Sequence, residues 1–187
     1  VVAWGGANAA ATNVPAGLSN VVAVSANEFH NLALRADGTV VAWGSLGQSS
    51  VPPDLTTVVA ISAGISHNLA VRADGTVVAW GASDFGQTNV PAGLSGVVAV
   101  AGGAQHSLAL KSDGTVVAWG ANSSGQTNVP EGLSGVVAIA AGAVHSLALK
   151  SDGTVVAWGG NDEHQTEVPT WLTGVAAISA GWKHSLA

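Results

Sequence analysis

Five histidines recur at nearly equal intervals and are the first residues whose type suggests chemistry. They stand at positions 30, 67, 106, 145 and 184, so successive histidines lie 37, 39, 39 and 39 residues apart. A ring of imidazoles would bind a metal if its nitrogens converged on one ion. However, His106 shares strand parity with Leu108 and Leu110. We therefore predict histidines that pack at strand starts and hydrogen-bond the neighbouring bend, with no metal site.

Aspartates and tryptophans recur with the same interval. Asp37, Asp74, Asp113 and Asp152 each precede a glycine. Calcium needs six to eight oxygen ligands, which one carboxylate per repeat does not supply, so we predict turn aspartates that bond nearby backbone N–H groups.

The tryptophans at positions 4, 43, 80, 119 and 158 could be sugar platforms. Their place in an apolar strand favours packing between repeats instead.

A fourteen-residue stretch holds these residues in place. Ser107–Gly120 recurs unchanged at Ser146–Gly159, and looser copies occupy residues 31–44 and 68–81. Leu108 and Leu110 alternate with small residues, which is the period of a strand. Asp-Gly then predicts a tight turn, and the β-branched and aromatic run that follows predicts a second strand. The unit is a β-hairpin.

The hairpin repeats predict the fold class. Each repeat of about 39 residues reads as three or four short strands without a helical period, which is typical of a β-propeller blade. We expect an all-β propeller of five blades forming a single domain over residues 1–187. Residues 1–5 and 175–187 would complete one blade between them. Pairing of these N-terminal and C-terminal strands would close the ring and remove two open sheet edges.

Composition excludes several classes of function. The 187 residues carry a net charge of -6 with only five Lys and Arg, so we expect no nucleic-acid partner. No apolar run approaches the ~18 residues that span a membrane, so we expect no membrane partner. The chain has no cysteine and therefore no disulfide or thiolate metal site. We expect no cofactor.

The assembled repeat resembles the regulator of chromosome condensation (RCC1) repeat family. The resemblance lies in Ala141–Leu149, Asp152–Gly159 and Gly125–Thr127 and returns in register along the chain. It implies a propeller of four-stranded blades, of which family members usually have about seven. Within the family, Val1–Gly6 and the Gln-Thr-x-Val-Pro runs resemble secreted bacterial propellers that inhibit β-lactamases. That likeness favours a bacterial extracellular or periplasmic location.

The resemblance to the inhibitory propellers also lets us ask whether this chain would bind a β-lactamase. The inhibitory propellers present an aromatic residue just before the position of each repeat histidine. Here Phe29 fits, Trp182 is one residue off, and the other copies carry Ser66, Gln105 and Val144. Loss of the aromatic row argues against the same inhibitory target.

The positions that vary between copies are the candidate recognition residues. A binding site for one partner breaks the repeat symmetry, because its residues take different roles. Two zones vary, namely the bend before each histidine and the loop after each Trp-Gly. Aromatic anchors and a charged rim in and near these zones predict a partner-binding set. It comprises Glu28, Phe29, Asp84, Phe85, Asp162, Glu163, Trp171, Trp182 and Lys183.

These observations favour a non-enzymatic scaffold that recognises a protein through variable loops on one face. A rigid ring would hold its loops pre-formed, which lowers the entropic cost of binding. A carbohydrate-binding propeller is the alternative, but equivalent pockets would need the same residues in every copy. An engineered or recently amplified repeat protein without a selected ligand is a third interpretation. No Ser–His–Asp set stands apart from the repeats, so we predict no catalytic residues and no enzyme.

Overall fold

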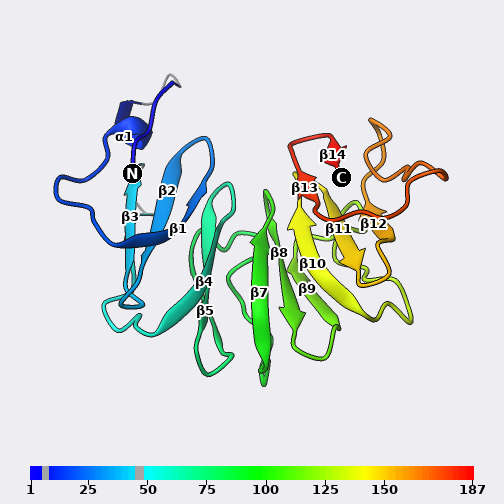
Figure 1. Ribbon diagram of the computed structural model, residues 1–187, viewed down its shortest axis with the longest axis horizontal. Helices are drawn as coiled ribbons and strands as arrows, with labels where there is room; N and C mark the ends of the chain where they lie inside the picture. The colour runs from blue at the N-terminus through cyan, green and yellow to red at the C-terminus, as the bar shows by residue number, and fades with distance from the viewer. Residues whose placement is uncertain (6–8, 45–48) are drawn as a thin grey trace.

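The computed structural model describes residues 1–5, 9–44 and 49–187 (Figure 1). It contains four antiparallel sheets of three strands, a fifth of two strands, and one helical turn, α1 (Ala9–Thr12). The three-stranded sheets are β1 (Val21–Ala26), β2 (His30–Arg35) and β3 (Val40–Gly44); β4 (Val58–Ala63), β5 (His67–Arg72) and β6 (Val77–Gly81); β7 (Val97–Gly102), β8 (His106–Lys111) and β9 (Val116–Gly120); and β10 (Val136–Ala141), β11 (His145–Lys150) and β12 (Val155–Gly159). The two-stranded sheet is β13 (Ser179–Ala180) and β14 (Ser185–Leu186).

The four hairpins predicted at 31–44, 68–81, 107–120 and 146–159 are present, and their turns are held as the sequence suggests. In the third blade, Asp113 Oδ1 accepts hydrogen bonds from Thr115 N at 3.0 Å and from Thr115 Oγ1 at 2.6 Å. Gly114 between them has a φ of 78°, which only glycine adopts at low cost. The Thr115 hydroxyl is the main reason why the pKa of Asp113 lies below its usual range. The turn prediction for the aspartates is confirmed.

The apolar core lies between blades. Leu108 and Leu110 of the third blade pack against Val136, Ala148 and Trp158 of the fourth. Equivalent clusters join the first blade to the second and the second to the third. The middle strands of the two interior blades, β5 and β8, are therefore buried on both faces. β5 turns Leu69 and Val71, and β8 turns Leu108 and Leu110, toward the next blade, and each turns an alanine toward the preceding one.

Packing between blades is confirmed for Trp80, Trp119 and Trp158, whereas Trp43 is buried near α1 and donates to Ala11 O. Trp43, Trp80, Trp119 and Trp158 are 7–8% exposed, whereas Trp4 is 85% exposed. Trp4 lies in Val1–Gly5, which forms no strand. For Trp4 the packing prediction is wrong in this structure.

The all-β repeat architecture is confirmed, and its details differ from expectation. Each complete blade has three strands rather than four, and 127–130, the candidate edge strand of one blade, forms no strand. Four blades are complete, and the fifth is represented by β13 and β14 alone in the described part of the chain.

The five-blade closed ring stays a prediction. The blades form an open arc, with the N-terminus on one arm and the C-terminus on the other (Figure 1). Among the described strands, β14 pairs only with β13. No helix within the described ranges has the length and apolar character needed to cross a membrane.

Candidate functional site

The repeat histidines connect neighbouring blades. His67 Nε2 lies 2.9 Å from Ser107 Oγ of the next blade, and that hydroxyl donates to Gln87 O at 2.8 Å. A serine hydroxyl has one hydrogen, so His67 Nε2 must carry the proton and donate it. The same arrangement joins His106 to Ser146, at 3.0 Å. The strand-start position is confirmed, but the side-chain partner belongs to the next blade rather than to the bend.

Burial keeps these imidazoles neutral. His67 and His106 are fully buried, and desolvation lowers the pKa of each to about 4, with neighbouring histidines adding repulsion. Each packs against the glycine three residues before it, where an added Cβ would collide with the ring. Among the described residues, no group of three or more His, Asp or Glu side chains converges on a metal position.

The first repeat departs from this pattern at the bend. Asn27 stands where the other copies have glycine, and its Nδ2 lies 3.1 Å from His30 Nδ1 and bonds Gly64 O of the next blade. In the second to fourth blades, the histidine Nδ1 atoms have no hydrogen-bond partner. Asn27 therefore supplies in one blade a contact that glycine cannot make.

The two variable zones form one face, which we call the loop face. Within each hairpin the histidine pairs with the glycine after the tryptophan, so the bend and the loop meet at the same end of the blade. Backbone hydrogen bonds join them, for example Ala121 N to Gln105 O at 2.8 Å and Gly160 N to Val144 O at 2.7 Å. Loop residues 6–8 and 45–48, which include part of the variable zone, lie outside the described residues.

The bends of all five repeats converge on a central cavity of about 180 Å³. Glycine and alanine line most of it, with Asn27, Ile65 and Trp182 as the larger contributors. Pockets for drug-sized ligands usually measure about 300–1,000 Å³, so this hollow suits a single side chain.

The structure places most of the predicted recognition residues on the loop face, although on different blades. Phe29, Phe85 and Trp182 are exposed there by 38%, 51% and 55%. Glu28 adjoins Phe29, and both line a cavity of about 840 Å³ beside β1. Trp171 lines a second cavity, beside β14, together with Glu163 and Lys183.

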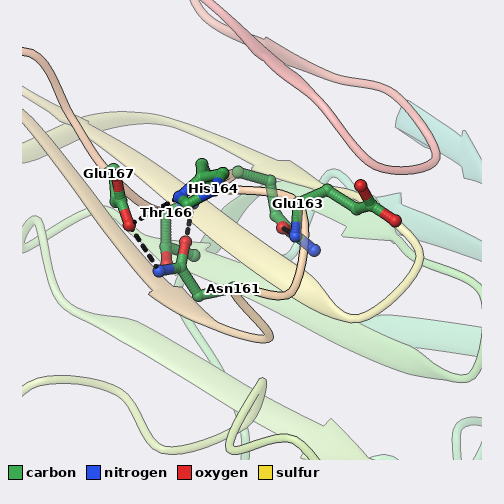
Figure 2. A network of polar contacts seen from close by, with 6 residues as sticks. Asn161, Glu163, His164, Thr166 and Glu167 are labelled. Atoms are coloured by element: carbon green, nitrogen blue, oxygen red, sulfur yellow. Dashed lines mark hydrogen bonds and ion pairs between the residues drawn. The ribbon is translucent and has the colours of Figure 1, made fainter.

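A polar network occupies the loop of the fourth repeat (Figure 2). Glu167 Oε1 lies 2.9 Å from His164 Nδ1 and accepts from Asn161 Nδ2 at 3.1 Å. The hydrogen bond with Glu167 raises the pKa of His164, and the same contact lowers the pKa of Glu167. Beside the network, Lys183 Nζ donates to Glu163 Oε1 at 2.8 Å, which joins the bend of the fifth repeat to this loop.

Asn161, His164 and Glu167 were missing from the predicted set. His164 has a φ of 61° where the second and third repeats have glycine, and Glu167 stands where those repeats have asparagine. The two departures from the repeat occur together and form a contact. A search for paired departures would have found them.

The structure resembles several solved propellers. Prp20p from Saccharomyces cerevisiae aligns with a TM-score of 0.73 at 21% identity, over 88% of this chain and 55% of that one. Yeast RCC1 (Prp20) bound to Kap60 gives 0.75 at 22%, over 92% and 54%. The ectodomain of the Arabidopsis thaliana receptor kinase ACR4 gives 0.72 at 22%, over 95% and 65%. The chain thus spans about half the length of the yeast propellers.

Comparison at the sequence level identifies the family. No curated protein sequence matches the chain. The family model described as "Regulator of chromosome condensation (RCC1) repeat" matches residues 21–48, 58–87, 97–126 and 136–165, which together exceed half of the chain. The chain therefore belongs to the RCC1 repeat family.

Proposed function

We propose that this chain is a non-enzymatic binding module that recognises a protein partner through the loop face. One observation carries the proposal: the side chains that vary between repeats gather at one end of a frame that hardly varies. The frame is bonded blade to blade and holds the described loops in place before a partner arrives, so that binding costs less entropy.

The chemistry of the loop face suggests the partner's surface. Four of the five Lys and Arg residues stand at the opposite ends of the blades, beside the Asp-Gly turns. The loop face carries Lys183 together with Glu28, Asp84, Asp162, Glu163 and Glu167. An acidic face with exposed aromatic anchors fits a basic protein surface that offers one side chain to the central cavity.

The structures similar to this chain are compatible with protein recognition. Prp20p is described by its binding to Gsp1p and histones, and yeast RCC1 (Prp20) was solved bound to Kap60. At about one-fifth identity these proteins support the fold, and the partner of this chain remains to be determined by experiment. A bacterial origin, an extracellular or periplasmic location and likeness to β-lactamase inhibitors remain predictions.

The carbohydrate alternative has less support. A lectin-like propeller would repeat one pocket in each blade, yet the loops at 82–85, 121–124 and 160–163 differ in sequence. The five bends share one small cavity instead. A glycan array that shows binding at several equivalent sites would favour the lectin.

A capture experiment tests the protein-binding proposal. The 187-residue chain would be used as bait beside Phe85→Ala/Trp182→Ala, with Trp171→Ala as a control that removes an exposed tryptophan off the loop face. We expect one protein to be retained by the parent chain and by the control, lost with the double variant, and released by raised salt. Equal retention by all three baits would contradict the proposal.

A further inference from the structure

The central cavity of the loop face is bordered by one repeated position of the bend, two residues before each histidine. This position is Ile65 in the second repeat and Trp182 in the fifth, but Ala104 and Ala143 in the third and fourth. All four residues line the cavity of about 180 Å³. The two alanines therefore leave open a space that a large side chain takes up at the same position of the second repeat.

Buried glycines form the base of the cavity. Gly64, Gly103 and Gly142 are buried and line it. In the third repeat, a Cβ added to Gly103 would collide with the His106 ring and would lie 2.6 Å from Gly142 O. The base of the cavity is therefore bare backbone, and the packing beneath it fixes the shape of the hollow.

The backbone polar groups around the cavity are already bonded. The N–H groups of the three glycines donate to the carbonyl oxygens of the histidines three residues further on, each at 2.9 Å. The next N–H of the bend bonds the following blade, with Ile65 N at 3.1 Å from Gly103 O and Ala104 N at 3.3 Å from Gly142 O. These groups therefore need no partner from a ligand.

The cavity also offers no partner for a cation. Asn27 brings an amide into the lining, but its Nδ2 bonds Gly64 O, and its Oδ1 accepts from Phe29 N at 2.7 Å and from His30 N at 3.1 Å. Within the described part of the chain, the lining contains no Asp or Glu. A lysine or arginine side chain would lose hydration on entering and gain no charged partner. An apolar side chain would gain by leaving water.

Carboxylates stand outside the cavity, on both arms of the arc (Figure 1). Glu28 follows Asn27 in the bend of the first repeat, whereas Asp162 and Glu163 lie in the loop of the fourth. All three acidic side chains are exposed, and Lys183 bonds one of them, Glu163, at 2.8 Å. The charge around the cavity is thus complementary to cations that flank an inserted side chain.

We propose that the central cavity takes a bulky aliphatic side chain, of leucine size, from a partner segment that carries lysine or arginine on both sides of that residue. The inserted side chain would contact Ile65 and the methyl groups of Ala104 and Ala143. This inference rests on the proposed function, and it specifies which part of the partner the loop face recognises.

A series of peptides tests the cavity. Arg-Gly-Leu-Gly-Arg, Arg-Gly-Ala-Gly-Arg and Arg-Gly-Lys-Gly-Arg share their flanking charges and differ only at the central residue. NMR titration with the methyl groups of Ala104 and Ala143 as reporters measures weak affinities at the cavity itself. We expect the leucine peptide to bind at least about tenfold tighter than the alanine peptide, because it buries three more carbon atoms. The lysine peptide should bind more weakly than the leucine peptide.

Two variants at neighbouring positions supply the matched control. Ala104→Ile places in the third repeat the residue that the second repeat has at the same position, so we expect the bend to accommodate it and the cavity to be filled. The advantage of the leucine peptide over the alanine peptide should then be lost. Gln105→Ile adds the same side chain at an exposed residue outside the lining and should keep that advantage. Urea denaturation checks that both variants are folded.

The possible outcomes separate this inference from the proposed function. Equal affinity for the leucine and alanine peptides, or tighter binding of the lysine peptide, would overturn the cavity proposal and leave protein binding by the loop face in place. A folded Ala104→Ile chain that still prefers leucine would overturn it too. If no peptide binds, the cavity proposal falls, and the capture experiment decides the proposed function by itself.

Discussion

The junctions between blades and the loop face are built from the same repeats, yet they vary in opposite ways. At each of the three junctions, two large aliphatic side chains meet a valine, an alanine and a tryptophan; both are leucine at two junctions, and they are Leu69 and Val71 at the third. On the loop face, the residue before the histidine changes from Phe29 to Ser66, Gln105, Val144 and Lys183. Close packing restricts what a junction accepts, whereas a bend that is exposed or half-buried restricts its side chains less. The constant frame leaves the loops free to vary for recognition.

The largest effect should come from opening a cavity in a junction. Leu108→Ala removes a fully buried side chain, and we expect the free energy of unfolding to fall by about 2–5 kcal/mol, measured by urea denaturation. Val98→Ala on the same sheet, where the side chain is exposed, should cost no more than about 0.5 kcal/mol. Equal effects would mean that the junctions do not stabilise the arc.

Acid should weaken the junctions next. Burial lowers the pKa of His67 and His106 from 6.5 to about 4. Between these pH values the unfolded chain binds protons at these histidines and the folded chain does not. The stability is complete above pH 6.5 and falls as the pH drops from 6.5 to 4.

The turn aspartates and His164 affect stability over different pH ranges from these buried histidines. The turn aspartates have a lowered pKa, so their contribution is lost only below about pH 4. The pKa of His164 is raised, and its contribution is lost as the pH rises above 6.5, which is the opposite sign. Urea denaturation at pH 7, 5.5 and 4.5 measures how much the buried histidines lower the free energy of unfolding in acid. A His106→Gln chain should show a shallower dependence, and a flat profile for the parent chain would contradict the junction role.

The fold was largely predictable from the sequence because its repeat is a local signal. The period of 39 residues, the alternation in 107–110 and the Asp-Gly turns each depend on residues close together in the chain. Whether Val1–Gly5 pairs with β14 depends on contacts across the whole arc, which the repeat does not encode. The same reason explains why Trp4 differs from the other hairpin tryptophans.

The candidate site was less predictable. Variation between copies identifies two zones, and these meet on the loop face because a hairpin brings its two ends together; that they bind a partner stays a prediction. Trp171 lies on the turn at 169–172 and reaches Glu163 and Lys183 through the cavity beside β14, which all three side chains line. The hydrogen bond from each histidine to the next blade was also missed, because its partner lies about 40 residues away.

The smallest effect on stability should come from the loop face itself. Phe85→Ala and Trp182→Ala remove side chains that are more than half exposed, and we expect each free energy of unfolding to change by at most about 0.5 kcal/mol. Urea denaturation of both variants beside Leu108→Ala would measure the contrast directly. A cost near that of Leu108→Ala would show that these aromatics support the frame. Their differences between repeats would then reflect packing, and the distinction between constant junctions and free loops would fail.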